Sequence, residues 1–149
     1  MNLFIDADAC PVKAEALKVA ERYSIPVKIV SNGGMRPSRD PMVQVITVAA
    51  GADEADDWIV DQAVEGDIVI TADIPLAARI LEKAAHPLGP SGIPFTQATI
   101  GMALAMRQLK QDVREATHIQ TRNRSFSAKD RSDFLQSLDK LIVQLAKKA

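Results

Sequence analysis

Acidic residues occur in three groups, and their types and spacing are suited to binding a metal ion. The groups are Asp6 and Asp8; Asp53, Asp56 and Asp57; and Asp73. Carboxylates gathered in one place raise one another's pKa unless a cation shares the site. A hard divalent ion with oxygen ligands, Mg²⁺ or Mn²⁺, would neutralise them.

A centre of this kind is suited to hydrolysis of a phosphodiester bond. The ion activates water and stabilises the leaving oxygen, and a carboxylate without metal acts as general base. We therefore interpret all six acids as candidate metal ligands. The candidate catalytic acids among them are Asp6, Asp56, Asp57 and Asp73.

The elements that must position these acids alternate between strands and helices. Short apolar runs predict strands at residues 2–6, 27–30, 43–48 and 67–71. Helices are predicted between them, including 52–65 and 74–85. This alternation predicts a three-layer α/β sandwich with a mainly parallel sheet, folded as a single domain over residues 1–149. Ligands of such sheets bind at the carboxyl ends of the strands, where two of the acidic groups lie.

The third acidic group lies at the start of the predicted helix 52–65. At 100° per residue, the core stripe of this helix consists of Ala52, Ala55, Ile59 and Ala63. Asp53, Asp56 and Asp57 fall along one edge of that stripe. A structural interpretation is also open, because acids stabilise a helix N-terminus by ~0.3–1 kcal/mol each, and the other acids could be caps or turn residues. It does not explain why all three groups fall at one end of the sheet.

The C-terminal part of the chain is predicted to contain two more helices. The almost entirely apolar segment 98–106 predicts a buried helix beneath the sheet. Residues 86–94 read as a connection, and residues 115–126 as a loop. Ser127 and Asp130 have the spacing of a capping box at the start of a final amphipathic helix.

Charge is divided unevenly along the chain. The formal net charge is -1, yet residues 1–100 hold 14 acidic and 8 basic side chains and residues 101–149 hold 5 and 10. A nucleic-acid substrate needs positive charge beside the acidic centre, because phosphate contacts dominate its affinity. We predict RNA or another single-stranded nucleic acid as the partner. The candidate substrate-binding residues are Arg36, Arg107, Arg122 and Arg124.

The sequence also bears on location. No stretch approaches the ~20 apolar residues of a membrane span, and Asp6 and Asp8 interrupt any N-terminal signal region. With one Cys, the chain can form no internal disulfide, and we expect a cytoplasmic protein. The sequence leaves open whether the chain forms a homodimer.

Three stretches carry a resemblance to a known family. They are FIDADACPV at residues 4–12, GADEADDWI at 51–59 and ITADIPL at 70–76. With these stretches the chain resembles the YaiI/YqxD-like family of bacterial proteins, which is grouped with PIN-like domains. The resemblance implies a PIN-like sandwich, a fold used by Mg²⁺- or Mn²⁺-dependent ribonucleases.

The same resemblance implies roles for individual residues. Asp6 corresponds to the acid at the end of the first strand, and the central helical acid is Asp56 or Asp57. Thr71 would brace the turn that carries the metal-binding Asp73. A fourth acid would be Asp8 or Asp53.

Two other functions remain as alternatives. A hydrophobic strand followed by Asp-x-Asp also occurs in haloacid-dehalogenase-like phosphatases, in which Asp6 would be the nucleophile and Asp8 the acid. Here Cys10 stands where that pattern has Thr or Val, and no Lys follows in a fitting motif. The second alternative is a non-catalytic regulatory module that binds metal or nucleic acid.

Overall fold

A parallel sheet forms the centre of the fold. The structure is a computed structural model that describes residues 1–7, 10–33, 35–51, 53–117 and 126–148, without the side chains of 107, 110–117 and 148. In these residues five strands pair in the order β3-β2-β1-β4-β5, and every pairing is parallel. The strands are β1 (Leu3–Asp6), β2 (Val27–Ser31), β3 (Val43–Thr47), β4 (Ile68–Ile70) and β5 (His86–Leu88).

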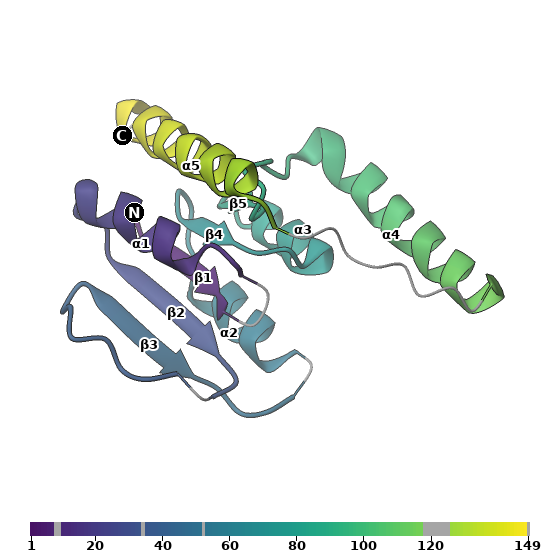
Figure 1. The fold of residues 1–149 in the computed structure, drawn as a ribbon, viewed down its shortest axis with the longest axis horizontal. Helices are drawn as coiled ribbons and strands as arrows, with labels where there is room; N and C mark the ends of the chain where they lie inside the picture. Colours follow the sequence, from purple (N-terminus) through teal and green to yellow (C-terminus); the bar gives the residue numbers. More distant parts are fainter. Residues whose placement is uncertain (8–9, 34, 52, 118–125, 149) are drawn as a thin grey trace.

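Helices cover both faces of this sheet (Figure 1). The described helices are α1 (Lys13–Arg22), α2 (Glu54–Gln62), α3 (Ile74–Glu82), α4 (Gln97–Thr117) and α5 (Ala128–Lys148). Buried side chains of α1 and α5 form one core with the sheet, and those of α2 and α3 form a second core on the other face. The predicted three-layer α/β sandwich is thus confirmed.

The alternation of side chains along β1 explains how one strand serves two cores. Leu3 and Ile5 point into the core under α1 and α5, and Phe4 points into the core under α2 and α3. All three are fully buried, as is typical of a central strand in a parallel sheet. The carboxyl end of β1 is therefore held in place from both sides.

The final helix begins as its sequence predicts. The Ser127 amide donates to Asp130 Oδ2 at 3.0 Å, and the Asp130 amide donates to Ser127 Oγ at 3.1 Å. This reciprocal pair is the capping box. Phe134, Leu138 and Ile142 follow at helical spacing and are buried against the sheet.

Two predicted element boundaries were wrong. The helix expected over 52–65 is shorter at its C-terminal end, because Ala63 already has an extended backbone (φ -69°, ψ 140°). Residues 86–94 do not form only a connection, since 86–88 are β5. Pro87 obscured this strand, yet proline is tolerated there because β5 is a short strand at the edge of the sheet.

The prediction of a buried helix at 98–106 was also wrong. Helix α4 contacts α3 and extends away from the sheet (Figure 1). Of its described side chains only Ile100 is buried, and Met102 is 74% exposed. Residues 115–117, predicted as part of a loop over 115–126, belong to α4, and residues 118–125 lie outside the described part of the chain.

Candidate acidic site

Asp6 and Asp73 lie on either side of the point where the sheet changes direction. The strand order places β1 beside both β2 and β4, so the chain runs outward in opposite directions from β1 and β4. Asp6 ends β1, and Asp73 follows β4 by a short turn. In open α/β sheets ligands bind at this switch point, outside the carboxyl ends of the strands.

Thr71 connects the two turns. Its hydroxyl donates to Asp6 Oδ2 at 3.0 Å and accepts from the Asp73 amide at 3.0 Å. Thr71 is fully buried and Asp6 is 5% exposed. The pair of bonds fixes the position of the Asp6 carboxylate relative to the backbone that carries Asp73.

Asp73 also begins a helix. It occupies the N-cap of α3, and its Oδ1 accepts from the Leu76 amide at 3.1 Å. The capping role anticipated by the structural interpretation is therefore present. This cap orients the Asp73 carboxylate against the first turn of α3.

Asp56 of α2 is the acid that faces both of these residues. Its half-buried position raises its pKa, as do the charges of Asp73 and Asp6, a hydrogen bond with Asp73 and the charge of Asp53, so that its pKa moves from 3.8 to about 7. Three of the other candidate acids therefore act on Asp56. A cation bound beside these carboxylates would favour the charged form of Asp56.

The remaining two candidate acids are Asp57 and Asp8. Asp57 Oδ1 pairs with Arg79 Nη1 of α3 at 2.8 Å, and both side chains are exposed. Helical spacing predicts that Asp53, Asp56 and Asp57 lie along one edge of the core stripe of the helix. In the structure, Asp57 forms an ion pair with Arg79. Asp8 lies outside the described residues. Arg79 was not singled out from the sequence, although a basic residue near the end of α3 was the available signal.

The chemistry of these donors fits a hard divalent cation, since all of them are carboxylate oxygens. The described residues nevertheless contain no group of three Asp, Glu, His or Cys side chains already arranged to hold a metal. Asp56 and Asp73 are instead hydrogen-bonded to each other. An ion would require Asp56 to exchange that hydrogen bond for a metal bond.

The predicted basic residues are only partly described. Arg36 is exposed in the segment between β2 and β3, and position 107 belongs to α4. Arg122 and Arg124 lie outside the described residues. Of these four arginines, only Arg36 therefore has a described side chain.

Arg131 of α5 is a further basic residue with defined contacts. Its Nη1 donates to the Pro11 carbonyl at 2.8 Å and pairs with Glu15 Oε1 at 3.1 Å. Pro11 lies in the segment that joins β1 to α1. Arg131 thus holds the start of α5 against this segment and α1.

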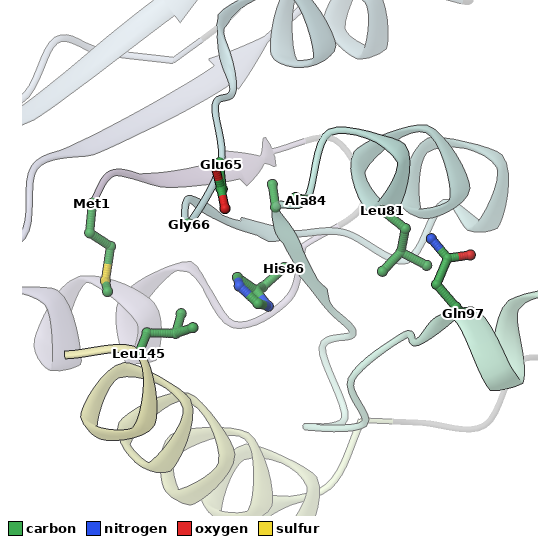
Figure 2. A pocket seen from close by; sticks show the side chains of 9 residues that line it. Met1, Glu65, Gly66, Leu81, Ala84, His86, Gln97 and Leu145 are labelled. Carbon is green, nitrogen blue, oxygen red and sulfur yellow. The ribbon is translucent and has the colours of Figure 1, made fainter. Parts of the chain in front are cut away.

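A cavity of about 600 Å³ lies at the opposite edge of the sheet (Figure 2). Met1 and His86 in its wall lie at the amino ends of β1 and β5. The other lining residues are Glu65, Gly66, Leu81, Ala84, Ala85, Gln97 and Leu145. The cavity is therefore separate from the acids, which gather at the carboxyl ends of the strands.

Comparison with known proteins identifies the family. Residues 4–144 match the model of the family described as "Uncharacterized BCR, YaiI/YqxD family". The chain belongs to the YaiI/YqxD family. The family recognised from the three sequence stretches is thereby confirmed.

Relatives within the YaiI/YqxD family match nearly the full length of this chain. UPF0178 protein mlr0875 of Mesorhizobium japonicum is 57% identical, over 99% of this chain and 96% of its own. A UPF0178 protein of Parvibaculum lavamentivorans is 54% identical, over 99% and 97%. No solved structure matches the chain. No helix in the described residues has the length and apolar character needed to cross a membrane.

Proposed function

We propose that this member of the YaiI/YqxD family is a cytoplasmic, metal-dependent nuclease of PIN-like type that hydrolyses RNA. The observation that carries the proposal is the meeting of Asp6, Asp56 and Asp73 at the switch point of a parallel sheet, where Thr71 joins Asp6 to the Asp73 turn and Asp56 is hydrogen-bonded to Asp73. The site has excess negative charge and oxygen donors alone, as a Mg²⁺ or Mn²⁺ centre requires.

Each side chain of the acidic site would have a separate role. Asp6, Asp56 and Asp73 would hold the ion, with Asp53 or Asp8 as a further acid. When bound, the ion would activate water and stabilise the leaving oxygen of a phosphodiester. Thr71 orients Asp6 and the Asp73 turn through its two hydrogen bonds. Arg36, Arg107, Arg122 and Arg124 would contact phosphates of the RNA, so that binding weakens steeply as salt rises.

Cleavage of labelled single-stranded RNA in the presence of Mn²⁺ tests this proposal. Asp6→Asn, Asp56→Asn and Asp73→Asn should each reduce the rate at least ~100-fold, because each removes a charged ligand of the ion. The matched control is Asp61→Asn. Asp61 is exposed on α2, the helix that carries Asp56, and its carboxylate contacts only Gln62 in the described hydrogen bonds. It should cleave like wild type.

The other outcomes decide against the proposal. Cleavage that is equal in all four variants would show a contaminating nuclease. Binding of RNA without turnover would favour the non-catalytic module. Turnover of p-nitrophenyl phosphate with a phosphoryl adduct on Asp6 would favour the phosphatase.

A further inference from the structure

Arg79 of α3 carries a positive charge next to the acidic site. Its Nη1 donates to Asp57 Oδ1 at 2.8 Å, and its side chain is 43% exposed. Asp57 directly follows Asp56 in α2, and Asp56 is hydrogen-bonded to Asp73 at the start of α3. The ion pair of Arg79 is therefore a neighbour of the contact that joins two of the site's carboxylates.

Contacts between α2 and α3 show how the two helices lie. In chain order they join Asp56 to Asp73, Asp57 to Arg79 and Val60, through its carbonyl, to Lys83. The partners advance along both helices in the same direction, so α2 and α3 lie side by side with their N-termini at the same edge of the sheet. That edge is the one at which the acids gather, and the ion pair of Arg79 follows the acidic contact directly.

The guanidinium of Arg79 has donors beyond the one that Asp57 accepts. In the contacts between described residues, Arg79 makes a single hydrogen bond, through Nη1. An arginine side chain has several other N–H donors in a planar arrangement, and such a group binds phosphate through paired, parallel hydrogen bonds. An exposed ion pair contributes little to stability, so the pairing with Asp57 orients the guanidinium more than it stabilises the fold.

Charge around the site favours a role for this arginine. Arg79 is the only basic residue within α2 and α3, both of which the structure describes in full. The other charged residues of these two helices are acids; they are Glu54, Asp56, Asp57, Asp61 and Glu82. Phosphate contacts dominate the affinity of proteins for nucleic acid. A strand that reaches the acids therefore meets Arg79 as a cation whose position is fixed by a contact beside them.

We propose that Arg79 binds a backbone phosphate of the RNA adjacent to the one that is cleaved, and that Asp57 positions its guanidinium. The inference rests on the nuclease function proposed for the acidic site. It assigns Asp57 to the substrate side of the site instead of to the ion. The exposure of the Asp57 side chain, 63%, agrees with this assignment, whereas Asp6 is buried and Asp56 is half-buried.

Kinetics of cleavage of single-stranded RNA separate substrate binding from chemistry. Arg79→Ala should raise KM about tenfold and leave kcat nearly unchanged, because a phosphate that does not react is bound equally in the ground state and the transition state. Arg79→Lys should recover part of the loss, since lysine keeps the charge without the planar fork. Asp57→Asn should retain far more of kcat than Asp56→Asn, because it removes no ligand of the ion.

The matched control is Arg22→Ala. Arg22 is also an exposed arginine paired with an aspartate, Asp139, at 2.6 Å. It lies in the last turn of α1, where the chain returns to the amino ends of the strands and is therefore away from the acids. Its KM should equal that of wild type.

Binding of fluorescently labelled single-stranded RNA, measured by anisotropy with Ca²⁺ in place of Mn²⁺, tests the contact without turnover. Arg79→Ala should weaken binding about tenfold and reduce the slope of log Kd against log salt by about 0.7, the value for one phosphate contact on a single strand. Arg22→Ala should bind like wild type. The urea midpoint of Arg79→Ala should match that of wild type, since the lost ion pair is exposed.

The outcomes distinguish this inference from the nuclease function itself. Cleavage by wild type, with KM and salt slope unchanged in Arg79→Ala, would overturn the role of Arg79 and leave the nuclease standing. RNA binding without cleavage that Arg79→Ala weakens would support the phosphate contact and overturn the nuclease. A loss of kcat in Asp57→Asn as large as in Asp56→Asn would overturn the positioning role of Asp57. A wild type that neither binds nor cleaves RNA would overturn both proposals.

Discussion

The pH dependence of stability in Asp56→Asn probes the raised pKa of Asp56. Because burial raises this pKa, as do the charges of Asp73 and Asp6, the folded protein binds a proton on this carboxyl that the unfolded chain has already released. Folding stability of wild type must therefore fall as pH rises from about 4 to about 7, and the loss is complete above the folded pKa. The amide of the variant resembles the protonated acid and has no such dependence.

The size of the effect follows from the shift. A rise in pKa from 3.8 to about 7 corresponds to about 4 kcal/mol at 1.36 kcal/mol per unit. Asp56 is only half-buried, so solvent screening reduces this to about 1–2 kcal/mol. The variant should thus be more stable than wild type at pH 8, with a midpoint of thermal unfolding about 3–6 °C higher for a chain of this size.

Thermal unfolding of the metal-free protein across this pH range measures the difference. Asp57→Asn is the matched control, because its carboxylate is exposed and paired with Arg79. It should stay within about 0.5 kcal/mol of wild type. A difference between Asp56→Asn and wild type that is the same at about pH 5 and about pH 8 would refute the inference that burial and the neighbouring acids raise the pKa of Asp56.

Three further substitutions test the framework around the site. Thr71→Val removes the hydrogen bonds of the Thr71 hydroxyl to the Asp6 carboxylate and the Asp73 amide and should cost about 1–3 kcal/mol in urea unfolding, whereas Thr71→Ser should retain most of the wild-type stability. Phe134→Ala removes a fully buried ring and should lower the free energy of unfolding by about 3–5 kcal/mol, measured by calorimetry. Gly92→Ala places a Cβ 2.8 Å from a backbone carbonyl oxygen of α5 at φ +89° and should cost more than about 1 kcal/mol, whereas Gly101→Ala, which meets no atom within 4 Å, should cost nothing in the same urea assay.

The sequence predicted the central part of the fold because local patterns determine it. The apolar runs that became β1 and β4 each end beside an acid, and the stripe Ala55, Ile59 and Ala63 is buried as helical spacing predicts. Strand order was not accessible in the same way, because it depends on contacts between distant segments. Only the structure shows that β1 and β4 are neighbours and that Thr71 joins their turns.

Apolar content misled the prediction for α4 because hydrophobicity does not specify what covers a surface. A helix rich in Ala, Leu and Met can be buried in its own core or in an interface, and periodicity along one chain does not distinguish the two. The ion pair of Asp57 could not be predicted from the sequence for a related reason. Helical angles place it near Asp56, but the ion pair with Arg79 depends on where α3 lies against α2.

The same contacts explain why a bound cation, and not a rearrangement of the acids, would relieve the repulsion in the proposed nuclease. Asp6 is held by Thr71, and Asp73 is held by the first turn of α3. Moving either carboxylate away breaks a hydrogen bond that contributes about 1 kcal/mol, and Asp6 is only 5% exposed, so its carboxylate would lose this bond in a buried setting. Asp56 has no comparable restraint among the described contacts, since its hydrogen bond is with Asp73 itself. It is therefore the acid that would turn to complete a metal site, and Thr71→Val should weaken Mn²⁺ binding by releasing Asp6 although it removes no ligand.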